Sequence, residues 1–121
     1  MRLVSTAGPP SFEVVVSPVA EGEGVHVAVA GELDLATASE FEATLLEQLA
    51  ARSVRLDLRG LSFMDSTGIR VLDALLRDLP MMGSTLLVDP HLQPPVRQIL
   101  TLTGMIDALP FDGDAATDQS P

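Results

Sequence analysis

The chain of 121 residues contains no cysteine, lysine, tryptophan or tyrosine. Without cysteine, disulfides, thiolate catalysis and cysteine metal sites are excluded. Without lysine, the common phosphate-binding loop is excluded as well, because its motif requires that residue. Phenylalanine is the only aromatic residue, so the core must be built from Leu, Val, Ile and Ala. A chain of this length holds one hydrophobic core and is expected to form one domain.

Positive charge is also scarce. The formal net charge is −10, and all seven basic residues are arginine. Phosphates of nucleic acids and anionic membrane surfaces would repel such a chain, so neither is expected as a partner. The acidity suits a basic protein partner, or it serves solubility alone. His26 and His91 stand far apart without a cluster of ligands around them, so we expect no metal site and no cofactor.

Export and membrane signals are missing from the sequence. The N-terminus has no basic region followed by an apolar run. No segment approaches the roughly 20 apolar residues that span a bilayer. We therefore expect a cytoplasmic protein.

Hydrophobic periodicity predicts the element order β-β-α-β-α-β-α-β within a domain at residues 12–111. Residues 1–11 are expected to be a flexible leader, and residues 112–121 an acidic, disordered tail. The first two strands form an antiparallel hairpin around an acidic turn at residues 21–24. The expected strands are 12–16, 25–30, 54–58, 84–88 and 105–111, and the expected helices are roughly 37–51, 67–79 and 94–102.

Alternation of strands and helices implies an α/β fold, with a mixed, mainly parallel sheet and helices packed against it. In such sheets the carboxyl ends of strands and the amino ends of helices gather at one edge, where binding sites form. Two acidic segments, 31–34 and 65–68, fall at this edge.

Segment 63–68, with the sequence Phe-Met-Asp-Ser-Thr-Gly, joins a strand to a long amphipathic helix. A helix start leaves backbone N–H groups unpaired, and a small polar side chain can cap them. Ser66 is therefore a candidate cap. It is also a candidate phosphate acceptor, because an added phosphate would meet free amides and the positive end of the helix dipole. Both roles can hold together.

The neighbours of Ser66 have structural and functional interpretations. Asp34 and Asp65 are turn formers or helix caps, or they present Ser66 and contact a partner. A paired-carboxylate acid/base site is the less favoured alternative. Gly31 and Gly68 are expected to permit close approach of the backbone, Gly68 leaving room around Ser66.

Two further interpretations concern charge and packing near this segment. Glu32 is expected to be solvated or to face a partner, and Arg70 is the one nearby base that could modulate a phosphate on Ser66. Phe63 and Met64 are interpreted mainly as core or near-core residues, since large apolar side chains are usually buried.

An enzyme is the rival class. A serine on a strand-to-helix turn superficially resembles the nucleophile elbow of hydrolases. Met64 stands where that motif requires its first glycine, and neither histidine is well placed as a base. We therefore expect no catalytic residues.

With these segments in place, the chain resembles a STAS domain, and specifically a small anti-sigma factor antagonist, over about residues 12–111. The resemblance is carried by Gly-Glu-Leu-Asp at 31–34 and by Leu-Ser-Phe-Met-Asp-Ser-Thr-Gly at 61–68. A third match is the helix at 96–105, which ends in Leu-Thr-Gly-Met. The absence of lysine and a short tail that lacks a fourth helix depart from the family pattern.

The resemblance implies a function. Unmodified members bind an anti-sigma factor and free a sigma factor for transcription. The anti-sigma factor is commonly a serine-protein kinase that phosphorylates the antagonist, and a phosphatase reverses this step; ATP belongs to the kinase. By position the acceptor is Ser66, and Thr67 stands where many members have serine. The implied partner-binding residues are Glu32, Asp34, Asp65, Ser66, Thr67, Gly68 and Arg70. The alternative is a STAS scaffold or ligand-sensing module that is never phosphorylated.

Overall fold

The computed structural model describes residues 3–5, 12–19 and 24–112. The strands are β1 (Leu3–Ser5), β2 (Phe12–Pro18), β3 (Gly24–Leu33), β4 (Ser53–Met64) and β5 (Leu86–Val88). The helices are α1 (Ala38–Ala51), α2 (Ser66–Asp78), the 3-10 turn η1 (Leu79–Met81), α3 (Pro94–Leu102) and α4 (Met105–Ala108).

The five strands form one sheet in the order β1-β2-β3-β4-β5. β1 with β2 and β2 with β3 pair antiparallel, whereas β3 with β4 and β4 with β5 pair parallel. An isolated parallel bridge joins Val88 to Phe111, so three of these five pairings are parallel. The mixed, mainly parallel sheet expected from the sequence is confirmed.

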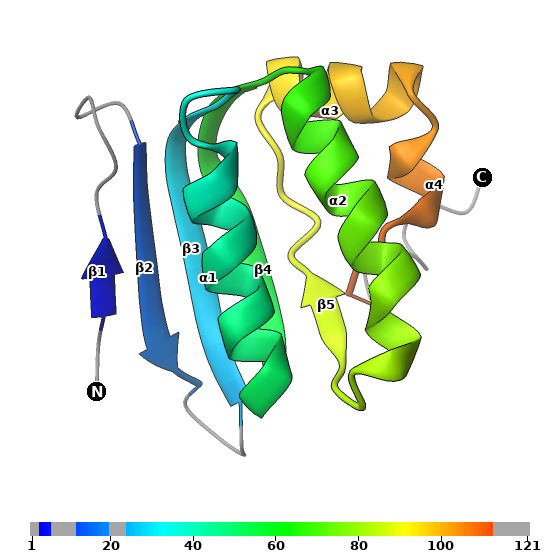
Figure 1. Cartoon of the computed structure of the whole chain (residues 1–121). Helices are drawn as coiled ribbons and strands as arrows, with labels where there is room; N and C mark the ends of the chain where they lie inside the picture. The colour runs from blue at the N-terminus through cyan, green and yellow to red at the C-terminus, as the bar shows by residue number, and fades with distance from the viewer. Residues whose placement is uncertain (1–2, 6–11, 20–23, 113–121) are drawn as a thin grey trace.

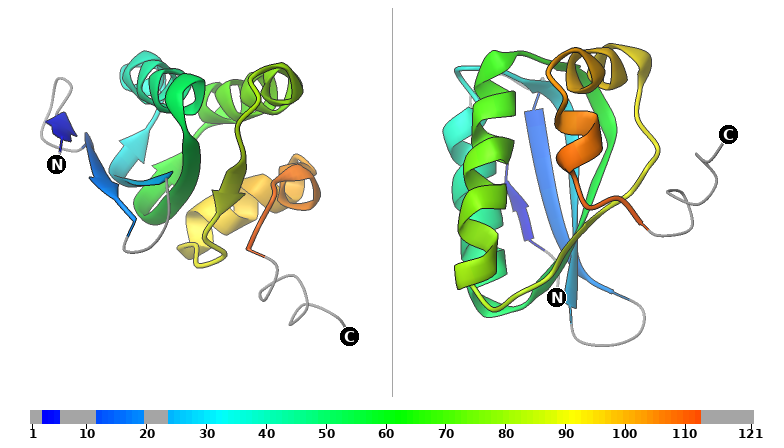
Figure 2. Two further views of the ribbon diagram at one scale, coloured as in Figure 1. Left: turned by 90° about the horizontal axis from the view of Figure 1, so that it is seen from below. Right: turned by 90° about the vertical axis from the view of Figure 1, so that its right-hand side faces the viewer.

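The helices form separate layers. α1 and α2 lie side by side on one face of the sheet, and α3 lies on its other side near the carboxyl end of β4, with α4 next to α3 (Figures 1 and 2). Alternate strand residues such as Val27 and Leu56 are fully buried beneath α1 and α2, together with Leu45 and Leu72 from those helices. No helix within the described ranges is long and apolar enough to cross a membrane.

β3 and β4 extend further than the sequence predicted. The predicted strand 25–30 continues to Leu33, and the predicted strand 54–58 continues to Met64. The register between them shifts at two places, between Ala28 and Ala30 and between Gly31 and Glu32. Each shift interrupts the period-2 alternation, which is why the pattern seemed to end early.

Gly60 allows β3 and β4 to remain paired through these shifts. A Cβ added there would lie 2.8 Å from the Cβ of Ala30 and 2.9 Å from the carbonyl oxygen of Val29. Any side chain would therefore push the two strands apart. The residues beyond Gly60, which lead to the predicted site, depend on this close approach.

The predicted last strand at 105–111 is wrong. Gly104 ends α3 in the left-handed conformation (φ 80°), as expected of a C-cap glycine. The chain then forms a fourth helix, α4, contrary to the expectation that it lacks one. Met105 and Leu109, four residues apart, are both buried, and this spacing fits one face of a helical turn. Only Phe111 pairs with the sheet, through Val88.

Other boundaries differ by a few residues. β2 runs two residues beyond the predicted end, and β5 begins two residues later than predicted. The third helix agrees with the prediction, since α3 ends at Leu102. β1 lies within the predicted leader, at residues 3–5, and it pairs with β2. The remainder of that leader, residues 20–23 of the acidic turn and the tail beyond Asp112 lie outside the described residues.

A buried carboxylate lies on the sheet face turned away from α1 and α2. Asp57 is only 4% exposed, and its carboxylate accepts hydrogen bonds from the backbone N–H and the guanidinium of Arg59 at 2.9 Å. Nε2 of His26 lies 3.3 Å from the same carboxylate. Burial alone would raise the pKa of Asp57, but the hydrogen bonds and charge of Arg59, aided by His26, hold it below its ordinary value.

This lowered pKa predicts acid sensitivity. A carboxyl group whose pKa is lower in the folded than in the unfolded state stabilises the fold at pH values above its unfolded pKa, near 3.8. This stabilisation is lost as the pH falls through the pKa of the folded state. We expect Asp57→Asn to reduce the free energy of unfolding by about 2 kcal/mol at neutral pH, with a much smaller loss at an acid pH well below 3.8. Urea unfolding at both pH values measures the difference.

The matched control is Asp73→Asn, because Asp73 pairs with Arg77 at 3.4 Å on the exposed face of α2. Its effect should stay within about 0.5 kcal/mol at either pH. Equal losses for Asp57→Asn at both pH values would contradict the ionic origin of the stabilisation.

Candidate functional site

The two acidic segments singled out from the sequence lie side by side. Leu33 pairs with Met64 at the carboxyl ends of β3 and β4. The N–H of Asp65 donates to the carbonyl of Leu33 at 3.1 Å, and the Ser62 hydroxyl donates to the carbonyl of Gly31 at 3.2 Å. Parallel pairing thus brings residues more than thirty positions apart to one edge.

Asp65 is the N-cap residue of α2. Its backbone is extended, and its Oδ1 accepts the N–H of Thr67 at 2.9 Å. Ser66 is consequently the first residue of the helix, and its candidate role as the cap is wrong. Aspartate caps a helix as well as serine does, and Asp65 reaches the free N–H groups first.

The Ser66 side chain is left free by this arrangement. Ser66 is exposed, and within the described residues its hydroxyl takes part in no hydrogen bond. It stands in the first turn of α2, where the helix dipole favours negative charge. The local geometry therefore suits a hydroxyl that accepts a phosphate.

Asp34 holds a tight turn before α1. Its Oδ1 accepts the N–H of Ala36 at 3.0 Å, and its own N–H donates to Oγ1 of Thr37 at 3.0 Å. The Thr37 hydroxyl in turn donates to the carbonyl of Glu32 at 2.9 Å. The interpretation of Asp34 as a turn former is confirmed. Thr37, 2% exposed, is a residue whose role sequence reasoning missed, although an Asp followed three positions later by Thr is typical of such a turn.

Gly68 packs beneath the helix start. A Cβ at Gly68 would lie 2.7 Å from Cγ of Met64 and 2.9 Å from Cδ2 of Leu33. The glycine is buried and lets α2 sit directly on the ends of both strands, so its space lies on the core side and not around Ser66 as expected. Gly31 is required for another reason, because its φ of 101° is in the left-handed region.

Two exposed apolar side chains flank the site, and sequence reasoning did not place them there. Leu35 is 78% exposed in the turn after Asp34, and Phe63 is 43% exposed on β4. The prediction that Phe63 is a core residue is wrong, whereas Met64, at 3%, is core as expected. Alternation along β4 gave no signal for this, because the shift of register leaves both Ser62 and Phe63 exposed between buried Leu61 and Met64.

Charge is distributed unevenly around Ser66. Glu32 is exposed, and Asp34 and Asp65 are half-buried. Arg70 is exposed one helical turn after Ser66, on the same side of α2, and can reach a phosphate added to that serine. Among the described residues, no three histidine, aspartate or glutamate side chains converge as metal ligands would.

The fold is an α/β domain, and this edge of its sheet presents apolar and acidic side chains around the exposed hydroxyl of Ser66. The chain belongs to the STAS domain family, because a family model described as "Mlab, STAS domain" matches residues 16–110. The resemblance drawn from the sequence is thereby confirmed.

Solved structures agree with this assignment. The crystal structure of an anti-sigma factor antagonist from Mycobacterium paratuberculosis is 26% identical, covers 93% of this chain and 97% of its own, and has a TM-score of 0.68. The structure of the anti-sigma factor antagonist SpoIIAA in its unphosphorylated form is 21% identical, covers 89% of this chain and 94% of its own, and has a TM-score of 0.63. At that identity the second shows a shared fold alone. No curated protein matches the chain.

Gly68 provides a test of how the site is supported. We expect Gly68→Ala to lower the free energy of unfolding by about 1–3 kcal/mol, because the added methyl group overlaps Met64 and Leu33. Chemical denaturation measures this loss. Ser66→Ala is the matched control two residues away and should change stability by less than about 0.5 kcal/mol, since Ser66 is exposed and is not the cap. A neutral Gly68→Ala would contradict the close packing of α2 on the strand ends.

Proposed function

We propose that the chain is an anti-sigma factor antagonist. It binds an anti-sigma factor that is also a serine-protein kinase, and this binding releases a sigma factor. Phosphorylation of Ser66 ends the binding, and a phosphatase restores it. The observation that carries the proposal is the free, exposed hydroxyl of Ser66 in the first turn of α2, beside the turn at Asp34.

The phosphorylation step needs from this chain only an exposed hydroxyl, and the kinase supplies ATP and a base. The Ser66 oxygen attacks the γ-phosphorus of ATP held by the kinase, the bond to the β-phosphate oxygen breaks, and ADP leaves. The hydroxyl proton passes to a base on the kinase. Because Asp65 caps α2 and Ser66 is not needed for capping, the serine can be modified without loss of the helix start.

The phosphate should act on the interface rather than on the fold. It adds close to two negative charges at neutral pH. The start of α2 offsets part of this by about 0.3–1 kcal/mol, and Arg70 lies one turn away. In the complex, however, the phosphate adds charge to an edge that already carries the carboxylates of Glu32, Asp34 and Asp65, and the partner has no group to pair with it. Like-charge repulsion there weakens binding.

The apolar residues of this edge supply the contact area. Leu35 and Phe63 are large side chains exposed at this edge, and Glu32, Asp34 and Asp65 belong to the same two segments. Apolar anchors with a polar rim are the usual anatomy of a protein interface. A partner with an apolar recess for these two side chains would complement this surface.

The hydrolase alternative has no support at this edge. His26 pairs with Asp57 near the amino end of β3, and His91 pairs with Asp89 at 2.7 Å. Neither belongs to the edge that carries Ser66, so no described histidine serves as its base. A STAS scaffold that is never phosphorylated remains the second candidate, and the labelling experiment separates the two.

The first test is phosphorylation by the cognate kinase. Incubation with that kinase and ATP, followed by mass spectrometry, should place one phosphate on Ser66. Thr67→Ala should still be labelled, whereas Ser66→Ala should not. Full labelling of Ser66→Ala would remove Ser66 as the acceptor. Binding of an unlabelled wild-type protein to the same partner would favour the scaffold.

The second test concerns binding to the same partner. Leu35→Ala and Phe63→Ala should each weaken binding by about tenfold to a hundredfold, because both truncate an apolar anchor. Met81→Ala is the control, since Met81 is 90% exposed at the other end of α2, and it should bind as wild type does. Ser66→Asp should weaken binding while Ser66→Ala retains it. If Met81→Ala weakens binding as much as Leu35→Ala, the edge is not the docking surface.

A further inference from the structure

An arginine without a partner lies one helical turn after Ser66. Arg70 is exposed on α2, and within the described part of the chain its guanidinium forms no hydrogen bond and no ion pair. Ser66 is the first residue of α2, and Arg70 follows four positions later. Residues at this spacing lie on the same face of a helix, so the two side chains are neighbours on its surface.

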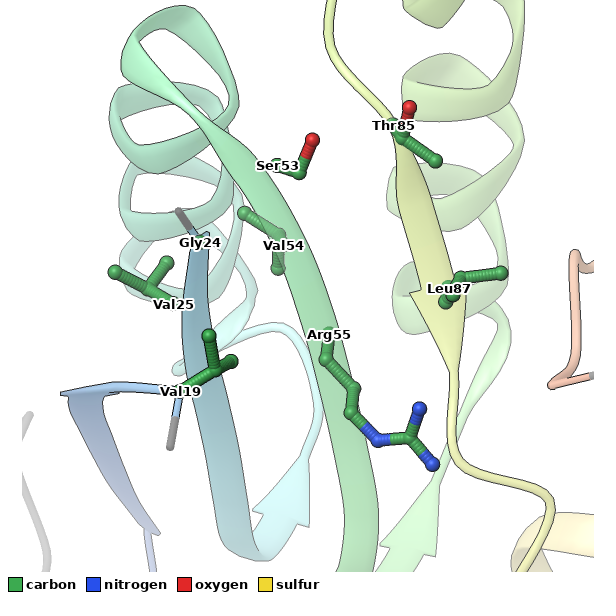
Figure 3. Close-up of a pocket in the computed structure, with 8 residues that line it drawn as sticks. All are labelled: Val19, Gly24, Val25, Ser53, Val54, Arg55, Thr85 and Leu87. Carbon is green, nitrogen blue, oxygen red and sulfur yellow. The ribbon is translucent and has the colours of Figure 1, made fainter. Parts of the chain in front are cut away.

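The arginine in the pocket of Figure 3 shows the contrast. Arg55 lines a shallow pocket of about 270 Å³ at the end of the sheet opposite Ser66, and its side chain extends from β4 toward β5. Its Nη1 lies 2.7 Å from Oδ2 of Asp112, and its Nη2 lies 3.8 Å from Oδ2 of Asp89. Arg55 is therefore already paired with carboxylates, whereas Arg70 is paired with none among the described residues.

α2 contains one ion pair with the spacing of Ser66 and Arg70. Nη2 of Arg77 lies 3.4 Å from Oδ2 of Asp73, four residues earlier, and both side chains are more than half exposed. The acidic residue precedes the arginine, which is the favourable order on a helix. Side chains lean toward the amino end of a helix, so an arginine extends toward the residue four positions before it. Ser66 and Arg70 repeat this order and spacing, with a neutral hydroxyl in the place of the carboxylate.

A phosphate on Ser66 would supply the missing anion. It carries close to two negative charges and three acceptor oxygens, and the planar guanidinium of arginine binds phosphate through paired hydrogen bonds. Arg70 is the one basic residue in segments 31–34 and 65–70. The other charged side chains of these segments are all acidic, namely Glu32, Asp34 and Asp65. Within these segments a phosphate therefore has a single cation to pair with.

We propose that a phosphate on Ser66 pairs with Arg70 on the same helix, and that this pair keeps the phosphate dianionic below neutral pH. The proposal rests on the proposed function and concerns how its off state is maintained. A phosphoserine gains a proton near about pH 6, so part of the charge that repels the partner would be lost in mildly acid solution. The carboxylates of the edge, and that of Glu40 in the first turn of α1, favour this protonation, whereas the guanidinium of Arg70 opposes it. The ion pair thus offsets the acidic residues.

The test uses the full chain with phosphoserine introduced at position 66 during translation, so that no kinase is needed. A pH titration followed by phosphorus NMR gives the pKa of the second ionisation of the phosphate. We expect Arg70→Gln to raise this pKa by about 0.3–0.7, which is a change of about twofold to fivefold in the proton dissociation constant. The carboxylates and the helix dipole are the same in both proteins, so the difference reports on Arg70.

Two further variants separate the ion pair from other effects. Arg77→Gln is the matched control, because Arg77 has the same charge on the same helix but lies about 16 Å further along its axis. At physiological salt this distance exceeds the screening length, so the pKa of the phosphate should change by less than about 0.1. Arg70→Lys keeps the charge without the planar fork and should restore about half of the difference or more.

Two results would overturn the proposal. One is an unchanged pKa of the phosphate in Arg70→Gln, and the other is a rise in Arg77→Gln as large as that in Arg70→Gln. Arg70 is exposed, so its replacement should leave the fold intact, and circular dichroism verifies this. Since the phosphoserine is introduced during translation, the titration reports on the ion pair even if the kinase does not label Ser66. Failure of the labelling experiment and failure of this one are therefore distinguishable.

Discussion

The parallel pairing of β3 with β4, carried past two shifts of register, is the constraint on which the site depends. It ends with Leu33 beside Met64 and with the N–H of Asp65 bonded to the carbonyl of Leu33. Because a helix follows each of these two strands at the same edge, the turn at Asp34 and the start of α2 are neighbours. Gly60 makes this possible, since any side chain there would separate the strands. The geometry of the edge thus depends on a packing requirement in the middle of β4.

The structural roles at this edge belong to the neighbours of Ser66. Asp65 caps α2, Gly68 seats the helix on the strand ends, and Thr37 ties the turn before α1 to the backbone of Glu32. Ser66 takes part in none of this. A residue without a structural task can gain and lose a phosphate many times while the fold persists. The hydrogen bonds of Asp65 and Thr37 fix the backbone on both sides of the gap between the two segments.

Periodicity was sufficient to predict the element order from β2 to α3, the mixed sheet and the meeting of the two acidic segments, but it missed β1. The prediction failed where the sequence pattern fits more than one local structure. Because of the shifts of register near Gly31, the sequence pattern did not show the full length of β3 and β4. The spacing of Met105 and Leu109 is compatible with a strand as well as with a helical turn. The exposure of Phe63 depends on the face that β4 turns to solvent after Gly60, which alternation could not follow through a bulge. The hydrogen bonds of Thr37 and the pocket at Arg55 arise from contacts between distant segments, so no local pattern reveals them.

The central claim is that Ser66 can carry a phosphate while α2 and the fold remain intact. The most direct measurement is amide hydrogen exchange along α2 in the protein with phosphoserine at position 66, compared with the unmodified protein. We expect protection of Val71, Leu72 and Leu75 to be unchanged, and the free energy of unfolding to differ by no more than about 1 kcal/mol. Loss of protection through the first turns of α2 would contradict this, because the phosphate would then act by melting the helix and not by repelling a partner.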